Sequence, residues 1–143
     1  MNRDEFFTKV DAKLHKKTGA NTSIETESQN RELVKQVISR LMPVVVSYRS
    51  KLQERGINAD VDSSPAGISI TLRYKDGDHN ELQIGSISKS SILELKTSLV
   101  ESGQAYVTTK TYDYDKWNDS IFETKLQKLI DNFLLYADKH GGI

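Results

Sequence analysis

Residues 57–112 read INADVDSSPAGISITLRYKDGDHNELQIGSISKSSILELKTSLVESGQAYVTTKTY, and this stretch decides the fold. Apolar and polar residues alternate along it in five short runs, which Gly, Ser, Asp and Pro residues separate. Alternation with a period of two is typical of strands with one buried face, and it is commonest in antiparallel sheets. Residues 68–74 show it most clearly. The stretch therefore predicts an antiparallel sheet of five sequential strands.

Helical patterns lie on both sides of this stretch. In residues 28–56 and again in residues 115–140, apolar positions recur every three or four residues, which is typical of a helix with one buried stripe. Pro43 removes one backbone donor from the first helix, so we expect a kink or a break there. Asp115 is expected to cap the second. The pattern predicts an α+β fold: a two-layer sandwich in which two long helices pack on one face of a five-stranded antiparallel meander.

The N-terminal part is expected to form a separate element. Its apolar side chains fall at helical spacing, which predicts a short amphipathic helix, at Phe6, Phe7, Val10 and Leu14. Residues 19–27 are polar and typical of a linker, and the pattern from Thr26 to Gln29 resembles a capping box. We therefore divide the chain into an N-terminal amphipathic helix (1–18), a polar linker (19–27) and a single α+β domain (28–143).

Composition excludes several classes of protein. The 143 residues carry 20 Lys plus Arg and 20 Asp plus Glu, so there is no chain-wide basic field for nucleic acid or anionic lipid. The chain has no cysteine, which excludes disulfides, thiol catalysis and Cys-ligated metals. The most apolar run, residues 41–46, is too short to span a bilayer, and the N-terminus lacks a signal-peptide core. We expect a cytoplasmic protein with no membrane partner.

The apolar pattern also predicts how the strands pair, because residues directly opposite each other share a face. Leu72 opposite Leu82 gives a three-residue loop at residues 76–78, and it places Arg73 opposite Glu81 as an independent charge match. For the third and fourth strands, the same reasoning predicts three pairs: Ile84 with Leu95, Gln83 with Lys96 and Ile87 with Ile92.

For the last hairpin, we expect Leu99 opposite Ala105, which also pairs Glu94 with Lys110. This register puts Tyr106 on the outer, solvated face of the sheet. It also predicts an apolar corner on that face, formed by Ile87, Ile92 and Tyr112. Exposed apolar patches mark interaction sites, so the corner contacts either another chain or a covering segment of the same chain. That segment is a linker, a loop or the N-terminal helix, whose apolar residues suited to cover it are Phe6, Phe7, Val10 and Leu14.

The sequence shows no arrangement typical of catalysis or metal binding. The histidines are scattered and are expected at the surface, at His15, His79 and His140. Asp76, Asp78 and Asn80 resemble the start of a calcium loop, but its twelfth position is Ile87 rather than Glu, so a hairpin tip is favoured. There is no Gly-rich phosphate loop and no nucleophile elbow. We expect no catalytic, cofactor-binding or metal-binding residues.

Two functional hypotheses follow from named residues, and a third, an enzyme with dispersed catalytic residues, has no motif that points to it. The first is a small non-enzymatic interaction or adaptor domain that binds protein, or a second copy of itself, through the outer sheet face, the N-terminal helix or both. Its candidate contact residues are Ile87, Ile92, Tyr112, Tyr106, Phe6 and Phe7. The alternative is single-stranded nucleic-acid binding on the sheet face, by stacking on Tyr106 and Tyr112 beside Arg73, Lys96 and Lys110. Glu81 and Glu94 would repel phosphate there, which favours the first hypothesis.

Overall fold

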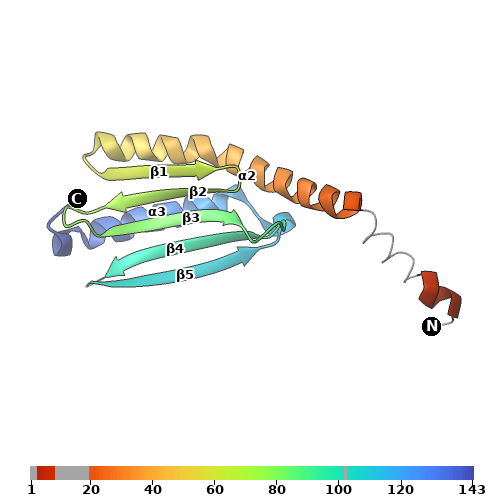
Figure 1. Ribbon diagram of the computed structural model, residues 1–143. Helices are drawn as coiled ribbons and strands as arrows, with labels where there is room; N and C mark the ends of the chain where they lie inside the picture. The colour runs from red at the N-terminus through yellow and green to blue at the C-terminus, as the bar shows by residue number, and fades with distance from the viewer. Residues whose placement is uncertain (1–2, 9–19, 102) are drawn as a thin grey trace.

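The structure is a computed structural model that describes residues 3–8, 20–101 and 103–143, and for residues 20–25 it describes the backbone alone. A short helical segment covers residues 3–8 (Figure 1). The remaining elements are, in chain order, α2 (Ala20–Glu54), β1 (Asn58–Ser64), β2 (Gly67–Arg73), β3 (His79–Ser86), β4 (Leu93–Glu101), β5 (Gln104–Tyr112), the 3₁₀ turn η1 (Tyr114–Lys116), α3 (Asp119–Leu135) and the 3₁₀ turn η2 (Ala137–His140).

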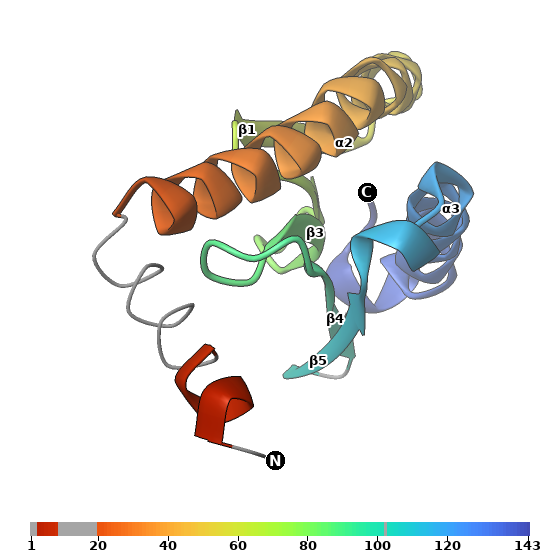
Figure 2. The ribbon, with the colours of Figure 1, turned by 90° about the vertical axis from the view of Figure 1, so that its right-hand side faces the viewer.

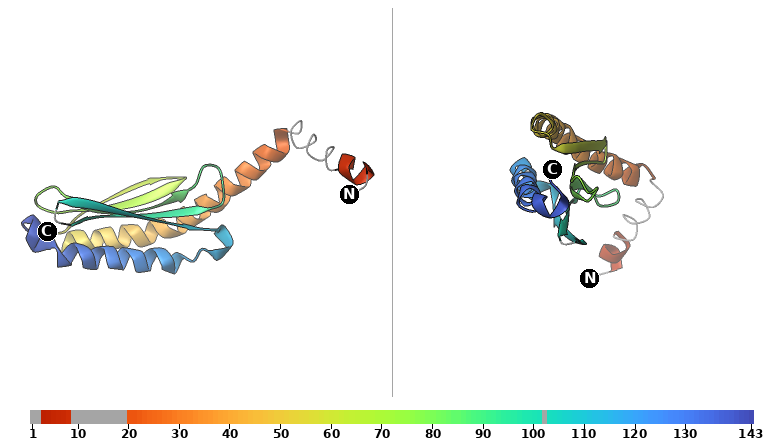
Figure 3. Two further views of the ribbon diagram at one scale, coloured as in Figure 1. Left: turned by 90° about the horizontal axis from the view of Figure 1, so that it is seen from below. Right: turned by 90° about the vertical axis from the view of Figure 1, so that its left-hand side faces the viewer.

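The five strands form one antiparallel sheet in the order β1-β2-β3-β4-β5, which confirms the predicted meander. Helix α2 packs mainly on β1 and β2, and α3 packs mainly on β3 and β4. Figure 3 shows both helices running along the sheet, with α2 continuing beyond its end. The protein is therefore an α+β fold. Within the described ranges, every helix is too short or too polar to cross a lipid bilayer.

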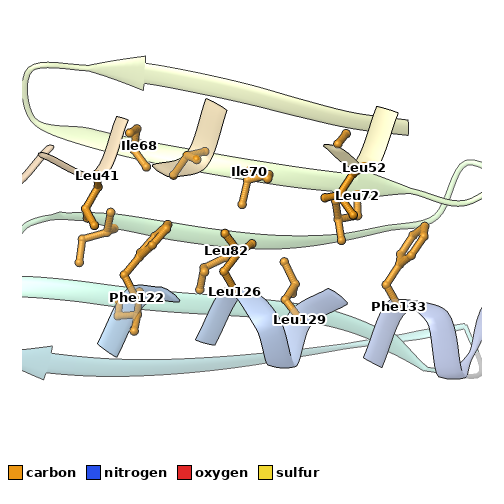
Figure 4. Close-up of a cluster of buried hydrophobic side chains, with 14 of the residues drawn as sticks. Leu41, Leu52, Ile68, Ile70, Leu72, Leu82, Phe122, Leu126, Leu129 and Phe133 are labelled. Atoms are coloured by element: carbon orange, nitrogen blue, oxygen red, sulfur yellow. The ribbon is translucent and has the colours of Figure 1, made fainter. Parts of the chain in front are cut away.

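The core lies where the apolar stripes of the helices meet the sheet (Figure 4). On β2 the buried residues are two apart, at Ile68, Ile70 and Leu72, as the alternation predicts. On α3 they are three or four apart, at Phe122, Leu126, Leu129 and Phe133. Complete burial of one such side chain contributes about 1.5–3 kcal/mol, so these stripes supply most of the drive to fold.

Helix α2 starts earlier than the sequence suggested and is not broken. It begins at Ala20, so residues 20–27, which were predicted as a polar linker, belong to the helix. The reason is that residues 20–42 contain no Gly or Pro, and polarity alone does not stop a helix. Of the kink or break expected at Pro43, the break does not occur, because the helix continues to Glu54 with Pro43 exposed inside it.

Helix α3 begins later than predicted. Asp115 lies in the 3₁₀ turn η1, and the N-cap is Asn118, whose Oδ1 accepts a hydrogen bond from the Ser120 N–H at 2.9 Å. The delay has a packing cause. Trp117 is extended, its ring lies edge-on to Tyr112 at 5.5 Å, and its Nε1 donates to Asp119 Oδ1 at 2.9 Å. These contacts fix the chain at Trp117 before the helix starts.

The pairing of β2 with β3 differs from the prediction by two residues. Leu82 lies opposite Ile70, and Leu72 lies opposite Asn80, which is fully buried. The hairpin closes at Tyr74, whose N–H donates to the Asp78 carbonyl at 2.8 Å. That leaves residues 75–77 as the loop, with Gly77 at φ +94° in the third position, where a three-residue hairpin requires a left-handed residue. A slip of two residues keeps every side chain on its predicted face.

One charge match is lost by this change. Arg73 does not lie opposite Glu81; its Nε is 3.5 Å from Asp60 Oδ2 on β1, and Glu81 lies opposite Thr71. The pairing of β3 with β4 is as predicted, with Ile84 opposite Leu95 and Gln83 opposite Lys96.

Candidate interaction surface at the β5 edge

Strand β5 is exposed along almost its whole length. Eight of its nine residues are exposed and only Tyr112 is half-buried. The exposed fractions of Tyr106 and Val107 are 51% and 56%, which is high for large side chains in a strand. Figure 2 shows why: β5 lies at the margin of the sheet farthest from α2 and extends past α3. On β2 and β3 one face is buried under the helices, whereas neither face of β5 is buried along most of the strand.

The pairing of β4 with β5 differs from the prediction by one residue, and this reverses the faces of β5. Leu99 lies opposite Tyr106 rather than Ala105, and the predicted Glu94–Lys110 pair does not form. The helix-covered side of the sheet now includes four side chains of β5: Tyr106, Thr108, Lys110 and Tyr112. The open side includes the other series: Ala105, Val107, Thr109 and Thr111.

The backbone of β5 has one unpaired edge. The Ile87 N–H donates to the Ile92 carbonyl at 3.0 Å, which fixes the residues of β4 that bond to β3. Because bonding alternates along an antiparallel strand, the remaining residues of β4 bond to β5. The outward N–H and C=O groups of β5 are then those of Ala105, Val107, Thr109 and Thr111. A strand of another chain that approaches this edge meets a row of unused donors and acceptors.

The opposite edge of the sheet differs in character. β1 has the sequence NADVDSS, with exposed Asp60 and Asp62, and Pro65 follows it directly. Charged side chains and proline are the usual means by which proteins discourage pairing at a sheet edge. β5 has the sequence QAYVTTKTY, in which Lys110 is the one charged residue and proline is absent. The two edges are therefore not equivalent, and β5 carries fewer of these protective features.

The predicted apolar corner does not form. Ile87 and Ile92 are paired as expected, with Ile87 36% exposed. Tyr112 is on the other side of the sheet, packed against the core and against Trp117, because of the one-residue change in register. Tyr106 is likewise on the helix-covered side, where it is exposed beyond α3.

Phe6 and Phe7 are exposed, at 54% and 52%, and their rings meet edge to face at 5.5 Å. The helical segment of residues 3–8 lies apart from the sheet and from the loop between β3 and β4 in Figures 1 and 3, so it does not cover that loop. Val10 and Leu14, the other apolar positions predicted for this helix, are outside the described residues.

His140 is a residue that the sequence interpretation placed wrongly. It is 5% exposed, and its Nδ1 lies 2.7 Å from Asp76 Oδ2 and 3.4 Å from Asp78 Oδ2. Its ring stacks on Tyr74 at 4.0 Å, and Tyr74 stacks on Phe133 at 4.1 Å. The histidine is 64 residues from Asp76 in sequence, so no local pattern could have revealed the cluster.

The donor atoms of Asp76, Asp78 and His140 lie within 4.8 Å of one another, and their types would suit a metal ion. The contacts within the cluster also have a structural role. Asp76 Oδ1 accepts the Asp78 N–H at 2.9 Å, as in a hairpin tip, and the Gly142 carbonyl accepts the Lys75 N–H at 3.2 Å. Partial burial acts to raise the pKa of Asp76, but hydrogen bonds from the Asp78 backbone and His140 outweigh it and lower that pKa. The cluster fastens the C-terminus to the β2–β3 hairpin.

A cavity of about 390 Å³ lies where α2 passes the β1–β2 turn and the β3–β4 loop. Two of its charged side chains, Glu27 and Lys89, pair with each other at 3.9 Å, and Asn30 Nδ2 donates to the Lys89 carbonyl at 3.0 Å. These contacts seat α2 on the loop.

The composition of the open face of the sheet also differs from the prediction. With Tyr106, Lys110 and Tyr112 on the other side, the strand residues on this face include no Phe, Tyr or Trp side chain. Its acidic residues outnumber Arg73 and Lys96; they are Asp60, Asp62, Glu81 and Glu94. Stacking of bases needs aromatic faces, so the nucleic-acid hypothesis loses the stacking on Tyr106 and Tyr112 beside Arg73 and Lys96.

Comparison of the chain with protein-family models, with curated proteins and with solved structures gave no match. Evidence about function therefore comes from the geometry of the surface itself.

Proposed function

We propose that this protein is a small non-enzymatic interaction domain that binds an extended segment of polypeptide at the outer edge of β5. In this proposal the fold is a two-layer sandwich, with two long helices under one face of the sheet and the other face open. The observation that supports it best is the exposure of β5 on both faces and along its outer edge. A cysteine-free sequence fits a reducing compartment, and we propose the cytoplasm.

Strand addition explains how such an edge would bind. Main-chain hydrogen bonds supply the affinity, and pockets for alternate side chains supply the specificity. The outward groups of residues 105–111 offer a regular ladder, and Val107 and Tyr106 offer apolar area on opposite faces. Lys110 favours an acidic or aromatic side chain on the added strand. The proposed ligand is therefore a β-prone, extended segment rather than a helix or a small molecule.

The helical segment of residues 3–8 is a second contact site in this proposal. Phe6 and Phe7 present two adjacent aromatic rings to solvent. Exposed aromatic side chains are enriched at protein interfaces, since they supply large contact area at low entropic cost. This site would act beside the β5 edge and not in place of it.

The test uses proline substitutions, because proline removes one backbone donor. Val107→Pro removes an outward N–H of β5 and leaves the β4–β5 ladder intact. Ser63→Pro is the matched control, because the same alternation turns the N–H of Ser63 outward on β1. Near-UV circular dichroism of Trp117 and the urea midpoint establish that both variants are folded.

A library of random peptides displayed on phage is selected on wild-type protein at low density. We expect extended peptides that bind wild type and Ser63→Pro equally and bind Val107→Pro about tenfold or more weakly, which is about 1.4 kcal/mol. Peptides that fail to distinguish folded Val107→Pro from Ser63→Pro would show that binding does not use the β5 edge.

A further inference from the structure

We infer that the segment added at β5 is the β5 of a second copy of this chain, paired antiparallel about a two-fold axis at Thr108. This inference rests on the proposed function and names the partner of the same edge. The product would be a symmetric dimer with one continuous ten-stranded sheet.

The first support is hydrogen-bond register. When a strand pairs antiparallel with its own copy, outward groups must meet outward groups. A two-fold axis at Thr108 brings Val107 opposite Thr109 of the second copy and Ala105 opposite Thr111 of the second copy. All four residues are outward on β5, so the full ladder forms. This axis also overlaps the two strands over all nine residues, Gln104–Tyr112.

The second support is charge. Lys110 is the single charged residue of β5, and any axis that placed it opposite itself would cost like-charge repulsion. The axis at Thr108 places Lys110 opposite Tyr106 of the second copy, on the same face of the sheet. An ammonium beside a tyrosine ring is a favourable pair, since the ring face is negative. The register of greatest overlap is therefore also one without charge conflict.

The same reasoning argues against β1 as the self-pairing edge. Its outward residues are Ala59, Val61 and Ser63, and a two-fold axis at Val61 would set Asp60 opposite Asp62 of the second copy. Those carboxylates repel each other. The symmetric dimer is thus favoured at one edge of the sheet and disfavoured at the other.

The shape of the molecule leaves room for the second copy. Figure 2 and the right-hand view of Figure 3 show β5 extending past α3, so an added strand meets no helix. Because the axis is perpendicular to the sheet, the helices of both copies lie on the same side. Tyr106 and Lys110 of both copies would then line the strip between the two α3 helices.

Disulfide trapping tests the register directly, because the chain has no cysteine of its own. Thr108→Cys places two thiols opposite each other across the axis, in a pair that is not hydrogen-bonded, with Cα atoms about 4.5 Å apart. That separation is within the range that a disulfide spans. Thr109→Cys is the matched control, since residue 109 lies opposite residue 107 of the second copy.

We expect Thr108→Cys to form a covalent dimer under mild oxidation and Thr109→Cys to form little. Light scattering should give wild type and Ser63→Pro a mass twice that of the 16.2 kDa chain. Val107→Pro should weaken dimerisation about tenfold or more.

Several outcomes overturn the inference. A wild type that stays monomeric at high concentration excludes the dimer, while peptides that still discriminate Val107→Pro would leave the proposed function standing. If Val107→Pro still dimerises and Thr108→Cys forms no covalent dimer, the dimer uses a surface other than the β5 edge. If wild type forms polymers, and both Val107→Pro and Ser63→Pro abolish them, the β1 edge of one copy pairs with the β5 edge of the next. Failure of both the dimer and the peptide selection rejects the proposed function too.

Discussion

At the scale of single residues, Asp119 is the main polar link between the two helices. Arg40 of α2 contacts it through Nε at 2.8 Å and Nη2 at 3.2 Å, and Trp117 Nε1 donates to it at 2.9 Å. Hydrogen bonding to Arg40 is the largest cause that lowers the pKa of Asp119; partial burial opposes it, and Trp117 adds to the lowering. Tyr48 makes a second link, since its hydroxyl donates to Glu123 at 2.9 Å.

This carboxylate predicts a pH dependence with a definite sign. A folded-state pKa below the ordinary aspartate value of 3.8 means that Asp119 stabilises the protein above about pH 3.8. This stability is lost as the pH falls through the lower, folded-state value. The side chains of Arg40 and Asp119 are 48% and 38% exposed, so solvent screening limits the pair to about 0.5–1 kcal/mol.

We therefore expect Asp119→Asn to lower the free energy of unfolding by that amount near neutral pH. The difference from wild type should shrink as the pH falls below about 4. Urea unfolding of both proteins at neutral and acidic pH measures this. Asp131→Asn, an exposed carboxylate of the same helix, is the control, and an equal effect there would contradict a role specific to the Arg40 pair.

The burial of two polar residues, Asn80 and His140, could not be predicted from the sequence. Alternation assigns polar residues to the surface, yet Asn80 is fully buried at a core-facing position of β3. Its amide donates to Asn132 Oδ1 at 3.3 Å and its carbonyl oxygen accepts the Val100 N–H at 3.0 Å. His140 is buried for the same kind of reason, by partners distant in sequence. Such partners exist only once the fold has formed, so spacing along the chain cannot indicate them.

At the scale of elements, the sequence predicted all five strands and their order, but only one of the three registers that it specified. The register of β3 with β4 was predictable because apolar side chains at Ile84 and Leu95 must share a buried face. β5 has no buried face, so its pattern could not select between neighbouring registers. The prediction treated Ala105 and Val107 as core residues, and both are exposed on the open side.

A pair of cysteines tests this register. Ser98 lies opposite Val107 in a pair that is not hydrogen-bonded, so Ser98→Cys with Val107→Cys should form an intramolecular disulfide readily. Ser98→Cys with Tyr106→Cys is the control, because those side chains lie on opposite faces of the sheet. Thiol titration after mild oxidation of each monomer counts the bonds, and faster closure of the control pair would restore the register predicted from sequence.

At the scale of the whole molecule, the long helix α2 determines the shape. It runs for 35 residues, packs on β1 and β2 along its later part, and continues past the end of the sheet toward the N-terminus (Figure 1). The sequence suggested that the domain starts near residue 28, because the residues before it are polar. Polar residues on a helix that projects into solvent are equally consistent with that pattern, so composition could not place the boundary.

Removal of residues 1–19 separates the two proposed contact sites. Phe6 and Phe7 are exposed, and the core is built from residues 34–137, so we expect the free energy of unfolding to change by less than about 0.5 kcal/mol. We also expect the truncated protein to dimerise as wild type does, since β5 is unchanged. Light scattering measures the dimerisation and urea unfolding measures the free energy of unfolding.

Phe6→Ser with Phe7→Ser in the full chain is the control, because it removes the aromatic contacts and keeps the chain length. A truncated protein that is monomeric, with the double variant monomeric as well, would assign self-association to the N-terminal segment instead of β5.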